Sequence, residues 1–180
     1  SLMRLIDDII DIAKIESGQL NLNKRIFNLS QMFDELKDFF LKELIRKNKT
    51  HIDLIIDHHR YTSELNILTD EVRLKQVFSN LLSNAVKFTE SGQIRFGISE
   101  ITDKSIHFYV KDTGIGIRES KLNVIFDRFT QAEENKNRFY GGTGLGLAIS
   151  KSLIELLEGE INVSSVQGEG ALFRFWIPFR

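Results

Sequence analysis

A cluster of four glycines constrains this chain more than any other feature of its sequence. Gly141, Gly142, Gly144 and Gly146 lie within six positions of RFYGGTGLGLAIS, and an apolar helical pattern follows directly. Glycine has no Cβ, so an anion can come close to the backbone amides there. Because the first amides of a helix are unpaired donors with partial positive charge, such a helix start suits a phosphate group. The alternative is a hinge that binds no ligand.

Two known phosphate-binding loops do not fit this cluster. A P-loop requires Gly, four residues and then Gly-Lys-Ser/Thr, and no register of the cluster supplies that order. The dinucleotide pattern G-x-G-x-x-G can begin at Gly142 and Gly144, but Leu147 stands where the third glycine belongs, and a polar segment precedes it in place of a strand. The cluster is therefore interpreted as a helix-start anion site of another kind.

Composition excludes several classes of protein. The 180 residues are 42% hydrophobic with a formal net charge of -1, which indicates one domain plus an appendage and no basic excess for nucleic acid. The sequence has no cysteine, which rules out disulfides and cysteine zinc sites. No apolar run reaches the ~18 residues of a membrane-spanning helix, and no signal-peptide pattern is present. We therefore predict a cytoplasmic segment that contacts neither nucleic acid nor membrane.

The N-terminal stretch is typical of a helix that continues upstream. Leu2, Leu5, Ile9 and Ile12 alternate spacings of three and four, as in a coiled-coil seam, and Gly18 supplies the stop. No N-cap precedes them, so we expect the sequence to begin inside a longer helix whose partners lie upstream. The alternative is an ordinary amphipathic helix packed on the core.

The remaining periodicity predicts an α+β domain. Ser30 is the expected N-cap of one helix, and Asp70 and Glu71 are expected to open another that runs to about Phe88. A third helix follows the glycine cluster. Alternation predicts strands at residues 51–57, 93–99 and 105–111, with two closing strands near 161–165 and 171–177. Strands paired in runs between separate helices indicate a two-layer sandwich, in which helices cover one face of a mixed sheet.

Two asparagines and a lysine share one stripe of the helix that ends near Phe88. Asn80, Asn84 and Lys87 fall at i, i+4 and i+7 beside its buried face. Asparagine is a poor residue for a helix interior, and aligned carboxamide oxygens suit a hard cation such as Mg²⁺, which keeps waters and substrate phosphates as its other ligands. Lys87 would then meet phosphate as a point charge. A solvated helix face is the alternative.

A tight turn is expected after the strand at 105–111. Asp112 is followed by Gly114 and Gly116, which permit a turn closed to residues that carry a Cβ. Asp-x-Gly is also common turn chemistry. The turn therefore indicates function only through its order and combination with the other two motifs.

Four stretches in a fixed order resemble the boxes of a known family. NLLSNAVKF, DTGIGI, IFDRFTQ and GGTGLGLAISKSLIELLEGEI resemble the N, G1, F and G2 boxes of the ATP-binding domain of two-component sensor histidine kinases, whose superfamily includes gyrase, mismatch-repair proteins and a heat-shock chaperone. The leading IDDIIDIAKIESGQLNL resembles the end of the second helix of their dimerisation and phosphoacceptor hairpin. The resemblance implies hairpin helix over residues 1–18, a linker over 19–25 and a Bergerat-type ATP-binding domain over 26–180.

The resemblance also implies how individual residues bind ATP and Mg²⁺. Asn84 would coordinate Mg²⁺, and Asn80 would support the metal and phosphate end of the site. Lys87 would contact phosphate, Phe88 would pack against adenine, and Asp112 would accept a hydrogen bond from the adenine amino group. Guanine would set a carbonyl oxygen against that carboxylate, which would select ATP.

Further nucleotide contacts are implied in the turn, in a mobile lid and at the helix start. Phe126 and Phe129 would anchor the base of a lid that runs to Tyr140, and the glycines after it would act as its hinge and offer amides to the triphosphate. The implied contacts are Gly114, Gly116, Phe126, Phe129, Lys136, Arg138, Tyr140, Gly142, Thr143, Gly144, Leu145 and Gly146.

The implied reaction is transfer of the ATP γ-phosphoryl group to a histidine on an upstream helix, with relay to an aspartate of a response-regulator receiver domain. None of His51, His58, His59 and His107 matches the acceptor box, so we expect the chain to bind Mg-ATP without phosphorylating itself. The phosphoacceptor helix and the receiver domain would be its partners. The full-length protein would form a homodimer, whether or not the inner membrane anchors it.

Two alternative functions remain open at this point. A gyrase- or chaperone-like ATPase would use a carboxylate base on the N-box helix, where this chain has Asn80. A degenerate nucleotide-binding scaffold is the other alternative, since Ala171 stands where the family commonly carries Ser or Thr.

Overall fold

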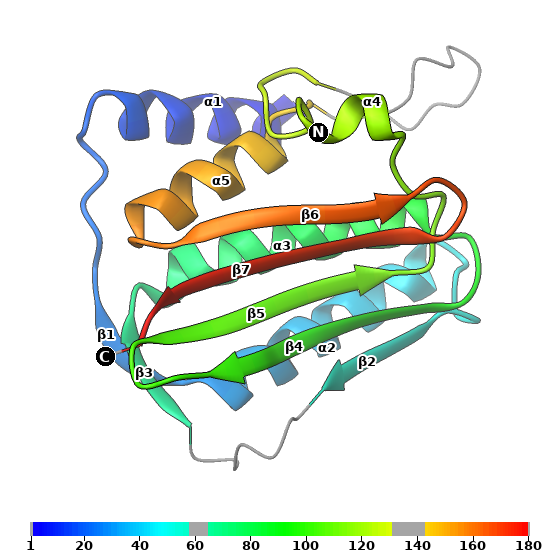
Figure 1. Cartoon of the computed structure of the whole chain (residues 1–180), viewed down its shortest axis with the longest axis horizontal. Helices are drawn as coiled ribbons and strands as arrows, with labels where there is room; N and C mark the ends of the chain where they lie inside the picture. The colour runs from blue at the N-terminus through cyan, green and yellow to red at the C-terminus, as the bar shows by residue number, and fades with distance from the viewer. Residues whose placement is uncertain (1, 58–64, 131–142, 180) are drawn as a thin grey trace.

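The structure is a computed structural model, which describes residues 2–57, 65–130 and 143–179 (Figure 1). Within these residues the helices are α1 (Leu2–Glu16), α2 (Leu29–Arg46), α3 (Glu71–Phe88), α4 (Glu119–Leu122) and α5 (Gly146–Leu156). The strands are β1 (Arg25–Asn28), β2 (Asp53–Asp57), β3 (Asn66–Thr69), β4 (Gln93–Ile101), β5 (Ser105–Asp112), β6 (Glu160–Val166) and β7 (Gly170–Pro178).

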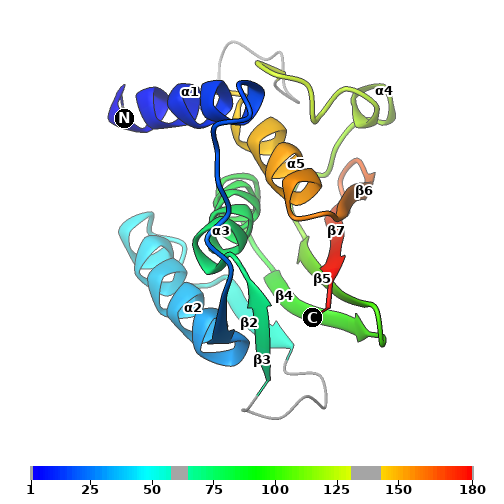
Figure 2. The ribbon, with the colours of Figure 1, turned by 90° about the vertical axis from the view of Figure 1, so that its left-hand side faces the viewer.

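Helices cover one face of a mixed five-stranded sheet. The strand order is β2-β4-β5-β7-β6, in which β2 pairs parallel with β4 and the other neighbours pair antiparallel. Figure 2 shows α2, α3 and α5 on the same side of this sheet. The predicted two-layer α+β sandwich is therefore confirmed.

Phenylalanine side chains from both layers form the centre of the core. Phe33 of α2 and Phe78 of α3 pack on Phe96, Phe108 and Phe175 of the sheet, with ring centroids of contacting pairs 5.1–6.4 Å apart. Most of these rings meet edge to face, the geometry that the aromatic quadrupole favours. Since Phe78 lies in the middle of α3, this packing fixes the helix that carries the asparagine stripe.

The N-cap of α2 is Asn28 rather than Ser30. The Asn28 side chain accepts a hydrogen bond from the N–H of Gln31 at 2.9 Å, and Leu29 is already helical. A cap residue needs an extended backbone, and Asn28 has one because it ends β1. The prediction of Ser30 as the cap is therefore wrong.

The sequence pattern does not predict the small antiparallel sheet of β1 and β3. Its register pairs Ile26 with Leu68 and Phe27 with Ile67. Phe27 and Ile67 are buried, whereas Ile26 and Leu68 are exposed. Asp70, the N-cap of α3, follows β3 directly, so this sheet leads the chain into α3.

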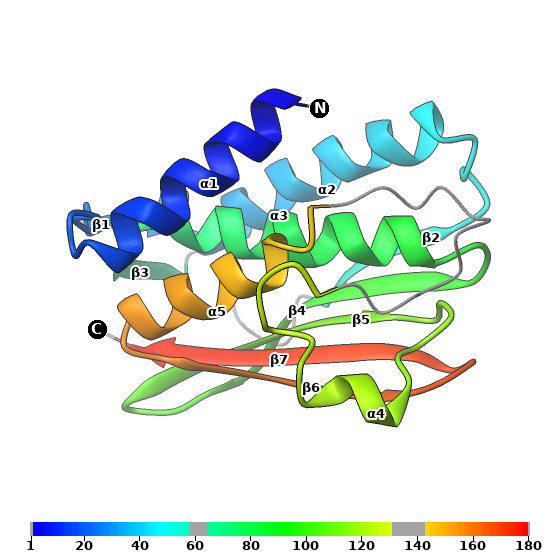
Figure 3. The same ribbon diagram turned by 90° about the horizontal axis from the view of Figure 1, so that it is seen from above.

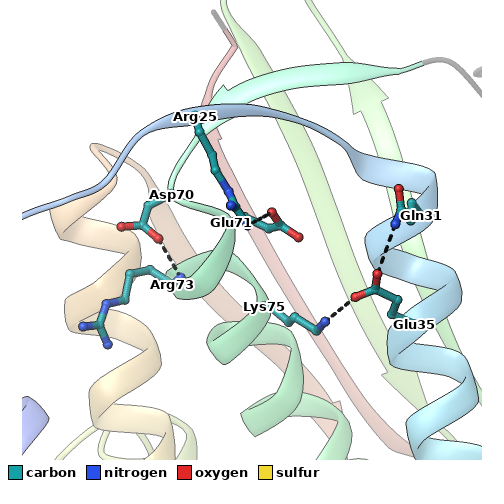
Figure 4. A network of polar contacts seen from close by, with 7 residues as sticks. All are labelled: Arg25, Gln31, Glu35, Asp70, Glu71, Arg73 and Lys75. Atoms are coloured by element: carbon teal, nitrogen blue, oxygen red, sulfur yellow. Dashed lines mark hydrogen bonds and ion pairs between the residues drawn. The ribbon is translucent and has the colours of Figure 1, made fainter.

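Ion pairs connect β1 and α2 to the first turns of α3 (Figure 4). Arg25 of β1 pairs with Glu71, and Lys75 Nζ lies 2.6 Å from a carboxylate oxygen of Glu35 on α2. The hydrogen bond and charge of Lys75 lower the pKa of Glu35. Each pair has at least one well-exposed partner, Arg25 in one and Glu35 in the other, so each contributes little to stability.

α1 lies against α5 and leaves part of its apolar surface exposed (Figure 3). Leu5, Ile12 and Ile15 pack on the core, whereas the side chains of Met3, Ile6, Ile9 and Ile10 are exposed. Of the predicted seam, Leu5 and Ile12 therefore face the domain and Ile9 faces away from it. None of the described helices is long and apolar enough to cross a membrane.

Candidate functional site

Hydrogen bonds join three of the segments that carry predicted site residues. The backbone N–H of Ile115 donates to the carbonyl oxygen of Phe88 at 3.2 Å, which connects the turn after β5 to the last turn of α3. The Asn80 side chain donates to the carbonyl oxygen of Gly146 at 3.2 Å, which connects α3 to the start of α5. Segments far apart in the sequence therefore form one connected region around α3.

Asp112 ends β5 as a buried carboxylate. Asp112 is 7% exposed, and its Oδ1 accepts a hydrogen bond from the N–H of Gly114 at 2.8 Å. Burial raises the pKa of Asp112 above its ordinary value of 3.8, and hydrogen bonds from the backbone of Gly114 and Ala171 lower this pKa in part. No cation of the described residues forms an ion pair with Asp112. Because a carboxylate offers about four acceptor positions, it can accept a further donor.

The turn after Asp112 passes too close to α3 for any side chain at position 114. A Cβ on Gly114 would lie 2.4 Å from the carbonyl oxygen of Phe88 and 2.9 Å from Oδ1 of Asp112. Gly116 continues the turn toward β6, where the N–H of Ile117 donates to Ser165 Oγ at 2.8 Å. Glycine at position 114 is therefore what lets the turn reach the end of α3.

The last two turns of α3 carry a carboxamide, an ammonium group and an aromatic ring. Asn84, Lys87 and Phe88 are half-buried, and Nζ of Lys87 lies 4.5 Å from the ring centroid of Phe88. The described residues contain no group of three or more His, Asp or Glu side chains that could hold a metal ion. A divalent cation beside Asn84 would therefore take most of its ligands from water and from a bound molecule.

Asn80 connects α3 to α5 rather than facing solvent. It is 9% exposed, and its Nδ2 donates to the carbonyl oxygen of Gly146 and, at 3.3 Å, to Oγ of Ser150. Ser150 in turn donates to the Gly146 carbonyl at 2.9 Å. Ser150 is not among the residues expected from the sequence; its position one helical turn after Gly146 is the signal for it, and the residue is fully buried.

Phe126 and Phe129 take different positions at the base of the expected lid. The Phe126 ring packs edge to face on Phe173 of β7, with centroids 6.3 Å apart. The Phe129 side chain is 69% exposed, but its backbone N–H donates to the carbonyl oxygen of Gly144 at 3.0 Å. A Cβ on Gly144, whose φ is +70°, would lie 2.8 Å from the Phe129 backbone. The predicted contacts Lys136, Arg138, Tyr140 and Gly142 lie outside the described residues, as do His58 and His59.

The start of α5 also contacts α1. The N–H of Leu145, which is fully buried, donates to Oγ1 of Thr143 at 3.2 Å. That hydroxyl donates to Oδ2 of Asp8 on α1 at 3.3 Å. The helix start that the glycine cluster predicts is thus formed by Thr143, Leu145 and Gly146, next to an acidic side chain.

The first turns of α3 are connected to α1 by a second set of polar contacts. Asp11 of α1 accepts hydrogen bonds from Arg73 at 3.3 Å and from Gln76 at 2.7 Å. Asp70 caps α3 through the N–H of Arg73 and also accepts from the backbone N–H of Asn23 at 2.8 Å. The connection between α1 and β1 is therefore hydrogen-bonded to the N-terminal end of α3.

Comparison with known proteins gives matches over this region and beyond it. Residues 69–180 match the family described as histidine kinase-, DNA gyrase B-, and HSP90-like ATPase. The chain is 42% identical over 184 residues to the autoinducer 2 sensor kinase/phosphatase LuxQ of Vibrio vulnificus and 42% identical over 178 residues to the circadian input-output histidine kinase CikA of Synechococcus elongatus. Each match covers 98% of this chain, which spans 21% of LuxQ and 23% of CikA.

A solved structure shares the fold across nearly the whole chain. Full-length ShkA in complex with AMPPNP superimposes with a TM-score of 0.84 at 29% sequence identity. The match covers 99% of this chain and 36% of ShkA. It therefore includes α1 as well as the sheet and its helices.

Proposed function

Because this chain belongs to the family of histidine kinase-, DNA gyrase B- and HSP90-like ATPases, we propose that it is the ATP-binding catalytic part of a sensor histidine kinase. LuxQ and CikA, which match it over almost its full length, are named as sensor or histidine kinases, and this favours the kinase over a gyrase- or chaperone-like ATPase. In this proposal residues 1–18 end a dimerisation and phosphoacceptor hairpin, residues 19–25 are a linker, and residues 26–180 bind ATP.

The observation that carries this proposal is the buried carboxylate of Asp112. Its described partners are backbone N–H groups, and it has acceptor capacity left in a setting closed to most water. The adenine amino group is a donor of the right kind for it. Phe88, whose carbonyl oxygen accepts from the N–H of Ile115 in the turn after Asp112, would pack on the base. Guanine would set oxygen against oxygen here, so ATP would be favoured over GTP.

The phosphates would lie between the end of α3 and the start of α5. Lys87 offers a positive charge, and the amides around Thr143 and Gly146 form a helix start. A single carboxamide oxygen, that of Asn84, and the absence of an acidic cluster in the described residues fit a magnesium ion that keeps waters and phosphate oxygens. When bound, such an ion would neutralise phosphate charge.

In phosphoryl transfer this domain would position the ATP and neutralise the charge of its phosphates, and no covalent intermediate with the domain is needed. The acceptor histidine would come from the phosphoacceptor helix of the same kinase, since none of the histidines of this chain matches the acceptor box. A receiver-domain aspartate would take the group next. In the full-length protein, two copies would pair through the hairpin.

Titration with a fluorescent ATP analogue tests the proposal. Saturable binding is expected, and Mg²⁺ should tighten it in the wild type but not in Asn84→Ala. Asn162→Ala, which alters an exposed asparagine of β6, is the matched control and should keep the Mg²⁺ effect. Absence of saturable binding would overturn the proposed function, and an unchanged Mg²⁺ effect in Asn84→Ala would overturn the metal role of that residue.

Incubation with γ-labelled ATP tests the transfer step. The chain alone should gain no acid-labile label. Addition of a separate hairpin that carries an acceptor histidine should give acid-labile label on the hairpin. Label on this chain itself would contradict the proposal that the acceptor lies elsewhere.

A further inference from the structure

Lys49, in the connection between α2 and β2, contacts the C-terminal end of α3. Its Nζ lies 3.1 Å from the carbonyl oxygen of Val86, 3.5 Å from that of Lys87 and 2.7 Å from that of Thr89. It also lies 3.3 Å from a carboxylate oxygen of Glu90. The Lys49 side chain is 14% exposed, and most of the contacts of its ammonium group are with backbone carbonyls at the end of α3.

The ammonium group completes the hydrogen bonding at the end of α3. The last carbonyls of a helix have no partner within it. In α3 the Ala85 carbonyl accepts from the N–H of Thr89, and the Phe88 carbonyl accepts from the N–H of Ile115. Lys49 supplies donors for the three carbonyls named above. A positive charge is also favoured at this end of the helix by its dipole.

Water cannot easily replace Lys49 at two of the three carbonyls, those of Val86 and Thr89. Val86 is 1% exposed and Thr89 is fully buried. A buried carbonyl without a donor carries its full desolvation cost. In the same connection, Nε2 of His51 lies 2.6 Å from the carbonyl oxygen of Glu90, which follows the helix.

We propose that Lys49 is a positioning residue for Mg-ATP: it holds the last turn of α3 so that Asn84 and Lys87 meet the metal and phosphates. This inference rests on the proposed function. The carbonyls that Lys49 holds belong to the turn that carries Lys87 and Phe88 and that receives the hydrogen bond of Ile115. Lys49 lies outside the four sequence boxes and acts through the backbone, without contact to the nucleotide.

Different parts of the nucleotide should depend on Lys49 to different degrees. Of the two proposed adenine contacts, Phe88 lies on the turn that Lys49 holds, whereas Asp112 ends β5, which is paired on both sides with β4 and β7. The proposed phosphate and metal contacts lie on α3 itself. Loss of the ammonium group should therefore weaken binding of Mg-ATP more than binding of adenosine.

The test compares Lys49→Met with Lys47→Met, which removes an exposed lysine two residues earlier. Affinities for a fluorescent ATP analogue with Mg²⁺, and for adenosine by competition, are measured well below the unfolding temperature. Lys49→Met should weaken analogue binding about 5- to 10-fold and adenosine binding less than about 2-fold, as expected for loss of a charge-assisted hydrogen bond at a distance from adenine. Lys47→Met should match the wild type.

Lys49→Arg and hydrogen exchange separate positioning from folding. Arginine keeps the charge, so it should restore analogue affinity to within about 3-fold of wild type, since its planar donor fork fits three convergent carbonyls less well than an ammonium group. It should also speed amide exchange at Phe88 and Thr89 while leaving residues 77–82 of the same helix unchanged. If Lys49→Met does not fold, Lys49→Arg carries the test.

Three results would overturn the inference. Wild-type analogue affinity in Lys49→Met would do so, and so would equal losses for analogue and adenosine, which indicate only a smaller folded fraction. Unchanged exchange at Phe88 and Thr89 in Lys49→Arg would do so as well. Failure of the wild type to bind the analogue would instead overturn the proposed function, and the inference with it.

Discussion

The two ends of α3 are held by groups of opposite charge and serve different neighbours. At the start, the carboxylate of Asp70 caps the helix and holds the connection from α1, while Asp11 contacts Arg73. At the end, the ammonium group of Lys49 and the N–H of Ile115 meet the last carbonyls. One helix therefore has different tasks at its two ends. Changes at the start should affect stability and α1 and leave the nucleotide site intact, whereas changes at the end should affect nucleotide binding as well as stability.

Gly114→Ala should have the largest effect, because the added methyl group would collide with the backbone at the end of α3. The added Cβ would meet the Phe88 carbonyl oxygen at 2.4 Å, so the turn must move and lose its bond to α3. We expect a loss of about 2–3 kcal/mol in the free energy of unfolding by urea and at least a roughly tenfold loss of ATP-analogue affinity.

Gly18→Asn is the control for Gly114→Ala. Gly18 has a φ of +64° and nothing within 4 Å of an added Cβ, and asparagine tolerates that backbone conformation. It should therefore change neither quantity beyond about 0.5 kcal/mol. Wild-type stability in Gly114→Ala would show that the turn and α3 are not in firm contact.

Asp112→Asn should have the second largest effect, mainly on nucleotide binding. The carboxamide keeps the shape but replaces a charged acceptor partly by a donor, so analogue affinity should fall about 10- to 100-fold. Preference for ATP over GTP should fall in the same titrations. Unchanged affinity would show that Asp112 does not contact adenine. It would also contradict the proposal that the end of α3 and the turn beside it bind the nucleotide.

The same variant tests the burial of this charge. Burial raises the pKa of Asp112 above 3.8, so the folded protein holds this proton more tightly than the unfolded chain. The contribution of this group to stability is therefore fully present below pH 3.8 and is lost as the pH rises through the folded-state pKa. As the pH rises through the folded-state pKa of Asp112, the free energy of unfolding of Asp112→Asn should increase relative to that of the wild type, as measured by urea unfolding. A pH-independent difference would contradict the burial of a charge there.

Asp70→Ala should lower the free energy of unfolding by about 1–2 kcal/mol through loss of the N-cap. It also leaves the N–H of Asn23 without its acceptor. Analogue affinity at low temperature should stay within about 2-fold of wild type, because the end of α3 is untouched. Asp38→Ala, at an exposed position of α2, is the matched control and should be close to neutral. A large loss of affinity in Asp70→Ala would break the separation between the two ends.

Asp11→Asn should have the smallest effect, below about 1 kcal/mol, since the pair with Arg73 is only partly buried. It should be visible as faster amide exchange in α1 with unchanged exchange at the end of α3. Higher ionic strength should move the wild type in the same direction, because salt screens the pair. Equally faster amide exchange in α1 and at the end of α3 would show that these two segments are not independent.

Local patterns account for the parts of the fold that the sequence predicts. Ile106, Phe108 and Val110 alternate along β5, and all three are buried, so the period of the strand and its inner face follow from the sequence. The resemblance to histidine kinases is visible in the sequence because the boxes are short, ordered and local, and the family match and the relatives confirm it. The residue roles inside those boxes stay predictions.

The missed features depend on contacts between distant segments. Asn28 and Ser30 are both able to cap a helix, and the choice follows from the extended end of β1, whose four residues are too few to show a period. Ser150 and Lys49 act through carbonyls supplied by other turns or helices. No periodicity or composition marks such residues, because their partners are set by the packing of α3.

The hydrogen bond between Phe129 and Gly144 has a consequence for how sequences of this kind can diverge. It places the backbone of residue 129 beside that of residue 144, so the two positions that join this stretch to the described fold are adjacent. Closing a longer loop adds only about 0.6 kcal/mol for each doubling of its length. Insertions, deletions or a whole transplanted segment between positions 129 and 144 should therefore leave the sheet intact. The architecture makes that stretch exchangeable between kinases without redesign of the domain.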